Sequence, residues 1–158
     1  MSGRALPKMI TACGPQSFIA VFDKDLVKLK IDQFGTSFVI EQEGKVHKNC
    51  SLLKTASLNS RYLVIGTEDG RIEIRDTQDL TSAPLLSKKL SKNDHIVDCE
   101  LITGVNGSLY ILSKTSGYIF TLDADWKLGD TVKHQISAEV DKPTLRLCQG
   151  PDGYLVLT

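Results

Sequence analysis

The sequence predicts an all-β fold in which units of about four antiparallel strands follow one another along the chain. Three observations support this. Stretches that read as two strands around a tight turn recur every 44–47 residues. A short apolar segment precedes each stretch, and another strand candidate follows it. No segment has a sustained apolar period of 3.6 residues, so almost no helix is expected.

The best-defined stretch is the hairpin "RYLVIGTEDGRIEIRD" at residues 61–76. Residues 62–65 form a compact β-branched and aromatic run, and residues 72–75 alternate apolar with charged side chains, as half-buried strands do. Asp69 and Gly70 predict the turn between the two strands. Gly tolerates positive φ there, and Asp hydrogen-bonds its local backbone.

Two other stretches repeat this layout, and a third begins it. "SFIAVFDKDLVKLKID" at residues 17–32 has Asp-Lys-Asp at its turn, and "SLYILSKTSGYIFTLD" lies at residues 108–123. "PDGYLVLT" at residues 151–158 starts a fourth copy. The hairpin is therefore one unit of a repeat.

The turn and the end of the hairpin supply landmarks for aligning the copies. Gly117 follows Gly70 by 47 positions and is predicted to mark the equivalent turn. Asp123 follows Asp76 by 47 positions, and Asp32 precedes Asp76 by 44. These residues are predicted to have structural roles in the turns and at the ends of the hairpins.

A short strand is expected before each hairpin, and each of these strands ends in a small residue. Cys occupies three of the four equivalent positions, which predicts a buried site where strands pack closely. Equivalent positions of successive units lie in separate sheets, so the ligands would not converge, and no metal or cofactor is predicted. The strands are 8–13, 52–56, 95–99 and 144–148, and their last residues are Cys13, Ala56, Cys99 and Cys148.

Fourth strands are expected at residues 36–43, 83–90 and 130–137. Four strands in roughly 44–47 residues are typical of a β-propeller blade. The prediction is a single partial propeller over residues 1–158. Its blades are expected at about 8–47, 48–92 and 93–140, and a fourth starts at 141–158.

At these residues the sequence resembles the WD-repeat family of β-propellers, most closely in "YLVIGTEDGRIEIRDT". Arg75-Asp76 stands in place of that family's Trp-Asp pair. Ile31-Asp32 and Leu122-Asp123 do so in the neighbouring copies.

The family's Gly-His dipeptide is missing, and only His47 lies at a plausible distance before its blade's first strand. The resemblance implies a partial buried network of His47, Thr67 and Asp69 that ties strands together. The alternative is an exposed His47.

Three blades and the start of a fourth do not close a ring, because closed propellers have at least four blades. An open stack would leave unpaired strand edges. We expect the chain to be the N-terminal part of a larger propeller, or a truncated form of one. The alternative is a partner chain that completes the ring.

Composition excludes some classes of function. The chain has 158 residues, 41% of them hydrophobic and 24% charged, with 19 basic and 19 acidic side chains. Because these charges cancel, no nucleic-acid partner is expected. No run approaches the ~18 apolar residues of a membrane span, and no secretory signal is evident. Four widely spaced cysteines without a signal indicate reduced thiols in the cytoplasm or nucleus.

No sequence motif predicts catalysis. Ser51 and Lys54 match the Ser-x-x-Lys of penicillin-recognising acyl enzymes, but residues three apart on a strand are expected to face opposite sides of the sheet. Phosphate loops, zinc-protease motifs and hydrolase elbows do not occur. Trp126, in "DADWKLGD", either anchors a partner or packs between adjacent blades.

The sequence therefore predicts a non-catalytic scaffold for protein–protein interactions. Its partners would be other proteins, including the subunits of a larger complex. The alternative is a propeller that is an enzyme or a guanine-nucleotide exchange factor, with its active residues outside this segment.

Overall fold

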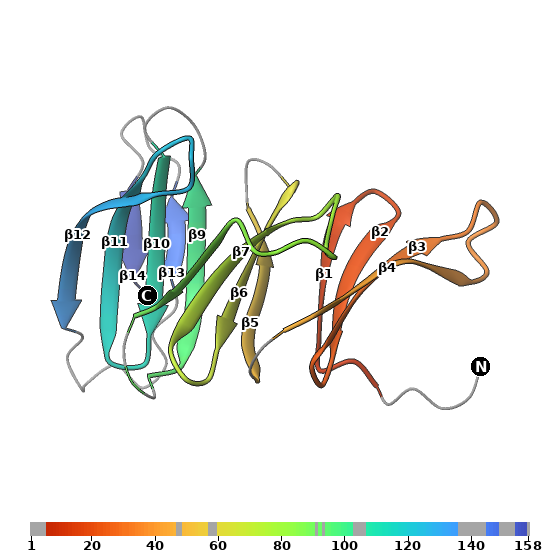
Figure 1. Ribbon diagram of the computed structural model, residues 1–158, viewed down its shortest axis with the longest axis horizontal. Coiled ribbons are helices and arrows are strands. Elements are labelled where there is room, and N and C mark those ends of the chain that lie inside the picture. The colour runs from red at the N-terminus through yellow and green to blue at the C-terminus, as the bar shows by residue number, and fades with distance from the viewer. Residues whose placement is uncertain are drawn as a thin grey trace.

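The computed structural model describes residues 6–46, 49–56, 60–90, 92, 94–102 and 107–135, and the backbone of residues 145–148 and 154–157. Every regular element in these ranges is a β-strand, so the predicted all-β class is confirmed. Figure 1 shows the strands gathered in sheets that stand side by side, with the first sheet at the right and the third at the left. No helix in the described part of the chain has the length and apolarity needed to cross a membrane.

The first sheet is a meander in which each strand pairs with the next one in the chain. The β2–β3 turn has Asp23 at φ 55°, a conformation that Asp tolerates better than most residues. Bulges interrupt the pairing near Ala12 in β1 and beside Lys28 in β3. The strands are β1 (Met9–Gly14), β2 (Ser17–Phe22), β3 (Asp25–Ile31) and β4 (Phe38–Lys45).

The second sheet has the same order and contains the hairpin with the clearest sequence pattern. Gly70 lies in its turn at φ 82°, so the predicted turn residue adopts the left-handed conformation that favours glycine. The strands are β5 (Cys50–Thr55), β6 (Tyr62–Thr67), β7 (Arg71–Asp76) and β8 (Leu86–Lys89).

The third sheet repeats the order, but its hairpin has a different register from the one predicted. Gly117 lies inside β11, paired with Leu112, rather than in the turn. Residues 113–116 form the turn. The β10–β11 pairing runs up to Leu112 and Gly117, whereas alignment with Gly70 of the second sheet predicted that Gly117 itself would lie in the turn. The prediction that Gly117 marks the turn is therefore wrong. The strands are β9 (Ile96–Ile102), β10 (Gly107–Ser113), β11 (Ser116–Leu122) and β12 (Leu128–Gln135).

A two-stranded antiparallel pair, β13 (Leu145–Cys148) and β14 (Tyr154–Leu157), follows the third sheet. Strand β13 contacts β9, just as β5 contacts β1 and β9 contacts β5. The first strands of the successive sheets therefore lie next to one another, and β13–β14 starts a fourth unit. Three four-stranded blades and the start of a fourth are confirmed. The blade boundaries predicted at 47/48, 92/93 and 140/141 fall on or beside residues outside the described part, and they stay predictions.

The first strands are joined by bonds from side chains to main-chain carbonyls. The Thr55 hydroxyl donates to Ala12 O at 3.1 Å, and the Ser51 hydroxyl donates to Ile96 O at 2.7 Å. The Lys54 ammonium donates to Cys99 O at 2.9 Å. These bonds connect β5 to β1 on one side and to β9 on the other.

Each sheet has two faces, named here by what they cover. The preceding face points toward the sheet formed by earlier residues, and the following face points toward the next sheet. In the second sheet, the preceding face carries Leu63, Ile65, Glu73 and Arg75, and it packs on Ile19, Val21 and Leu26 of the first sheet.

The following face of the second sheet packs on the third sheet. Gly66 lies on it, and a Cβ at this position would come within 2.6 Å of Ile96 Cγ2, so glycine permits the close approach of β9. The apolar cluster formed here is larger than the one between the first and second sheets. Its buried members are Ala56, Val64, Ile72, Ile74, Ile96, Cys99, Leu101, Leu109, Ile111, Tyr118, Phe120 and Leu122.

The small residues predicted at one equivalent position do not share one. Cys13 and Ala56 lie at the ends of their strands far from the hairpin turn, whereas Cys99 lies within β9 opposite Ile111. The difference arises because the β9–β10 pairing continues past Cys99 to Ile102, whereas the β5–β6 pairing ends at Thr55, just before Ala56. Cys99 is buried and Cys13 only partly so, and the side chain of Cys148 lies outside the described residues.

Candidate interaction surface

The predicted structural residues lie at two opposite ends of the sheets. Thr67, Asp69 and Gly70 belong to the β6–β7 turn, at one end of the second sheet. Asp76 ends β7 and Asp123 follows β11, at the other end. Thr67, Asp69 and Gly70 are therefore placed to stabilise the hairpin turn. Asp76 and Asp123 lie beside the loops that follow the third strands of their sheets.

Thr67 and Asp69 form the core of the β6–β7 turn. The buried Thr67 hydroxyl donates to Asp69 Oδ1 at 2.6 Å, and its oxygen accepts the Arg71 N–H at 3.0 Å. His47, the third member of the predicted network, lies outside the described residues. The Thr–Asp half of the network is thus in place.

The third sheet has a corresponding cluster that the sequence analysis missed. Asp94 Oδ2 accepts the hydroxyls of Ser113 at 2.5 Å and Thr115 at 2.6 Å, and Ser113 accepts the Ser116 N–H at 3.0 Å. Asp94 is buried, and its other carboxylate oxygen has no hydrogen-bond partner. The run Ser-Lys-Thr-Ser at 113–116 was the available signal, but Asp94 lies in a different segment of the chain.

Asp32, Asp76 and Asp123 each cap the loop that follows the third strand. Asp123 Oδ1 accepts the N–H groups of Asp125 at 2.9 Å and Lys127 at 2.8 Å, and Asp76 Oδ1 accepts the Gln78 N–H at 2.8 Å. Asp32 accepts the Ser37 hydroxyl at 2.7 Å and the Thr36 N–H at 2.9 Å, which hold its pKa well below the usual range. Such Asx turns order these loops, so each of the three sheets presents a defined loop at this end.

Trp126 is the most unusual residue of these loops. Its backbone has φ 64°, rare for a bulky non-glycine residue, and its N–H donates to Asp123 O at 3.2 Å. The half-buried indole packs edge-on against Tyr62 of the second sheet, with ring centroids 4.6 Å apart and planes at 65°. The predicted packing between adjacent blades therefore occurs, and it holds the ring at the junction of two sheets.

The Arg61 side chain adds a positive charge next to the Tyr62–Trp126 pair. The Arg61 guanidinium lies 5.8 Å from the centre of the Tyr62 ring and donates to Asp76 Oδ2 at 2.9 Å. Arg61, Tyr62 and Trp126 thus combine a charged donor with two aromatic rings at one end of the molecule. We name these three residues the aromatic cluster.

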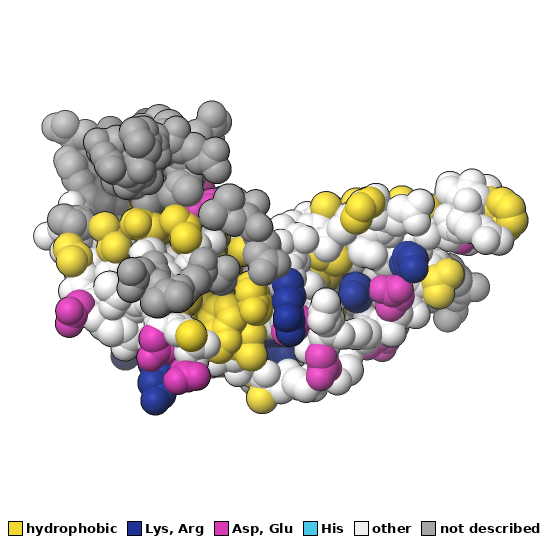
Figure 2. Space-filling model, turned by 90° about the horizontal axis from the view of Figure 1, so that it is seen from above, with side chains coloured by type: hydrophobic (Ala, Val, Ile, Leu, Met, Phe, Trp, Pro, Cys, Tyr) yellow, Lys and Arg dark blue, Asp and Glu magenta, His cyan; other side chains and the backbone are white. Residues whose placement is uncertain are grey.

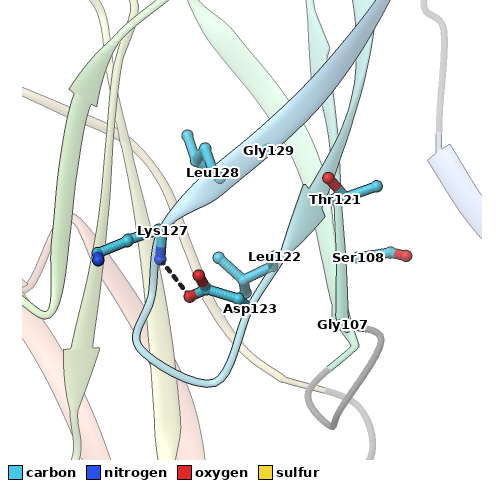
Figure 3. Close-up of a pocket in the computed structure, with 8 residues that line it drawn as sticks. All are labelled: Gly107, Ser108, Thr121, Leu122, Asp123, Lys127, Leu128 and Gly129. Carbon is cyan, nitrogen blue, oxygen red and sulfur yellow. Dashed lines mark hydrogen bonds between the residues drawn. The ribbon is translucent and has the colours of Figure 1, made fainter.

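A groove of about 400 Å³ lies beside the Trp126 loop. Figure 3 shows it between the start of β12, the start of β10 and the end of β11, with the Lys127 N–H bonded to Asp123 at its lower edge. Its walls mix glycines, hydroxyls, leucines and one charge of each sign. Its lining is Gly107, Ser108, Thr121, Leu122, Asp123, Lys127, Leu128 and Gly129.

No group of three or more His, Cys, Asp or Glu in the described ranges is placed to hold a metal ion. Cys13, Cys50 and Cys99 are free thiols. Burial raises the pKa of the Cys50 thiol to about 11 and that of Cys99 still further, so both stay protonated near neutral pH.

Ser51 and Lys54 do not lie on opposite sides of the sheet, and that expectation is wrong. A bulge between Cys50 and Leu52 interrupts the alternation of β5, and both side chains reach β9. Their partners are main-chain carbonyls and the carboxylates of Asp98 and Glu100, so the two residues join sheets.

No family model and no curated protein sequence matches this chain. Solved structures do match it, at low sequence identity. The β-propeller domain of Cps50 (Swd1) from Myceliophteria thermophila aligns with a TM-score of 0.58 and 14% identity over 84% of this chain. The WD40 domain of SCAP from fission yeast aligns with a TM-score of 0.62 and 12% identity over 96% of this chain.

A third match is apo AztD from Citrobacter koseri, with a TM-score of 0.51 and 16% identity over 75% of this chain. The chain spans 45%, 32% and 44% of the solved chains of Cps50, AztD and SCAP. It therefore has the fold of part of a WD40-type β-propeller, and the resemblance seen in the sequence is confirmed at the level of the fold.

Proposed function

We propose that this chain is part of a β-propeller scaffold that binds other proteins through the end bearing the aromatic cluster. The observation that carries the proposal is Trp126, held at φ 64° in an Asp-capped loop and seated on Tyr62. Backbone strain of this kind persists where the surrounding structure enforces it, and it is frequent at binding sites. The proposal includes a non-catalytic role, in the cytoplasm or nucleus, within a multi-subunit complex.

The chemistry of the aromatic cluster supports a protein ligand. Trp, Tyr and Arg are the residues most enriched among interface hot spots, because each buries a large area and keeps a polar group for orientation. Here the three side chains come from two sheets, so the position of each is set by blade packing. The adjoining groove offers space for a side chain next to this anchor.

The test uses binders selected from a displayed peptide or protein library against the full 158-residue chain. Trp126→Ala should weaken binding more than about tenfold, as expected for loss of a hot spot of about 2 kcal/mol. Phe34→Ala is the matched control, because Phe34 is an exposed aromatic in the corresponding loop of the first sheet. It should leave affinity almost unchanged.

Charge-reversal variants in the Trp126 loop test whether the loop contributes to binding without contributing to thermal stability. Asp125 and Lys127 are exposed in the same loop, so Asp125→Lys and Lys127→Glu should weaken binding while thermal melting stays the same. Binders whose affinity is insensitive to all of these loop variants would overturn the proposal.

A further inference from the structure

Strand β4 is the outermost strand of the first sheet, and no strand in the described part of the chain pairs with its outer edge. Near the middle of β4, the Gln42 side chain bonds to the main chain of Gln78 and Leu80 in the β7–β8 loop. The start of β4 has no such cover. Because alternate main-chain N–H and C=O groups of an edge strand point away from its one neighbour, this part of β4 can accept a further strand.

The start of β4 carries apolar side chains on both faces of the sheet. Val39 points to the face that packs on the second sheet, and it is nevertheless 54% exposed. Phe38 and Ile40 point to the opposite face and are 50% and 42% exposed. The Phe38 ring is held edge-on against Phe18, with ring centroids 6.3 Å apart. An edge strand with exposed apolar side chains is a template for pairing with another chain.

The outer edges of the other two sheets carry features that disfavour such pairing. Strand β8 has four residues and ends in two exposed lysines. Strand β12 has eight residues, but Asp130 and Lys133 are exposed on it, and a bulge interrupts its pairing with β11. Short length, charges and bulges are the usual protections of an edge. The charges and the bulge of β4 begin at Glu41, so residues 38–40 lack these protections.

A groove of about 560 Å³ adjoins the same part of β4. When an added strand pairs with a sheet edge, its main chain supplies affinity and its alternate side chains enter such pockets. Figures 1 and 2 show the β3–β4 end of the first sheet projecting at the right-hand end of the molecule, with hydrophobic side chains on its surface. The groove is lined by Gln16, Lys30, Ile31, Asp32, Gln33, Phe34, Val39 and Glu41.

We propose that an extended segment of another protein adds to the outer edge of β4 as a fifth strand of the first sheet. The main-chain groups of the edge require an extended peptide, and the apolar side chains on both faces favour apolar residues in it. The groove receives one of those residues. This interface is separate from the aromatic cluster, which lies at the junction of the second and third sheets.

The sequence of β4 makes a second copy of the chain a poor occupant. If β4 paired antiparallel with itself over its whole length, Ile40 would lie opposite Glu43 of the other copy, and Val39 opposite Gly44. Neither pairing places an apolar side chain against another apolar one, although such pairs stabilise a sheet. A partner strand with apolar residues opposite residues 38–40 provides those contacts.

The test uses a fluorescent synthetic peptide, Lys-Thr-Val-Ile-Val-Thr-Lys, whose anisotropy is followed as the full 158-residue chain is added. A version that is N-methylated at its three central residues keeps the side chains but cannot donate main-chain hydrogen bonds from either edge. It should bind more than about tenfold more weakly than the unmodified peptide. Binding of the unmodified peptide should also slow amide hydrogen exchange at residues 38–40.

Protein variants locate the interface. Val39→Lys places a charge on the edge and should weaken binding more than about tenfold. Val132→Lys is the matched control, because Val132 is 50% exposed on β12, the outermost strand of the third sheet. This variant and Trp126→Ala should bind the peptide as the wild type does, so the outcome is independent of the aromatic cluster. Circular dichroism establishes that the variants retain the β-fold.

Three results would overturn the proposal. The first is the absence of saturable binding up to about 1 mM peptide. The second is equal affinity of the wild type and Val39→Lys, or of the two peptides. The third is a doubling of the 17.4 kDa mass in light scattering that Val39→Lys abolishes, which would identify a second copy as the occupant of the edge.

Discussion

The interface between the first and second sheets and the interface between the second and third sheets both bury the facing sides of two blades, but their buried side chains differ in charge. Between the first and second sheets, the Arg75 guanidinium is buried and donates to Glu73 at 3.0 Å and to Lys45 O at 3.0 Å. Between the second and third sheets, no buried arginine of the described part of the chain takes part: a larger apolar cluster is accompanied by the ion pairs of the partly exposed Lys54 with Asp98 and Glu100.

The difference originates at one repeated position, the residue before the capping Asp. Arg75 and Leu122 both occupy it, and each lies in the packing against the preceding sheet. Ile31 occupies it in the first sheet, on the face opposite to the one packed on the second sheet. The fold therefore requires a side chain that fills this space, while the particular residue decides whether the interface is ionic or apolar.

The largest effect is expected from Arg75→Ala. It leaves Glu73 buried without its cation, and one oxygen of that carboxylate already has no hydrogen-bond partner. Breaking a buried pair from one side costs about 3–5 kcal/mol, measured here as the free energy of unfolding in urea. The control is the double variant Glu73→Leu with Arg75→Met, which makes the first interface apolar like the second.

This double variant should be close to the wild type in stability, because apolar replacements of similar volume often match a buried ion pair. If Arg75→Ala alone proved as stable as the wild type, the ionic description of the first interface would be wrong.

A smaller effect is expected from Lys54→Met at the second interface. The Lys54 side chain is 34% exposed and Glu100 is 5% exposed, so losing this pair should cost about 1–3 kcal/mol, less than losing the Arg75–Glu73 pair, in which both side chains are buried. Burial lowers the pKa of Lys54, but the carboxylates of Asp98 and Glu100 raise it by more, leaving it above its ordinary value of 10.5.

A raised pKa of a cation gives stability that is fully present below the ordinary pKa and is lost as pH rises through the folded-state value. The gap in urea midpoint between wild type and Lys54→Met should therefore close only in the alkaline range above 10.5. Lys92→Met, at an exposed position, is the control. A gap that closed near neutral pH would contradict this assignment.

The smallest effect is expected at Asp79, which orders the loop that seats Leu80 in the first interface. Hydrogen bonds from the hydroxyls of Ser82 and Thr81 lower the pKa of Asp79 from 3.8 to about 2. A lowered carboxyl pKa gives stability that is present above 3.8 and is lost as pH falls toward 2.

Asp79→Asn should therefore have a melting temperature that falls slightly less than the wild type's between these two pH values. Lys92→Met, at an exposed position outside this loop, should keep the wild-type slope over the same acidic range. Equal slopes for Asp79→Asn and the wild type would contradict the role of Asp79.

Local chemistry explains which predictions succeeded. The hairpin at 61–76 was found from its alternation and its Asp-Gly turn, and both depend only on neighbouring residues. The third hairpin was found as well, but the turn was misplaced at Gly117, because ladder length depends on pairing that spacing alone does not reveal. The same change of register moved Cys99 away from the position predicted for it.

The candidate site was predicted only in part. Trp126 stood out by its residue type and its place after a hairpin, and the capping role of Asp123 followed from its position. Tyr62 and Arg61 were not linked to it, since they lie in another sheet and some 64 positions earlier along the chain. Asp94 was not linked to Ser113 and Thr115, because it lies 19 and 21 positions earlier along the chain.

By itself the sequence determined the strands, their order and the repeat, because alternation and turn chemistry act over a few residues. Only the tertiary structure decided what each face touches: that Arg75 is buried against β4, and that Trp126 meets Tyr62. Those outcomes depend on contacts between sheets, which no local pattern contains.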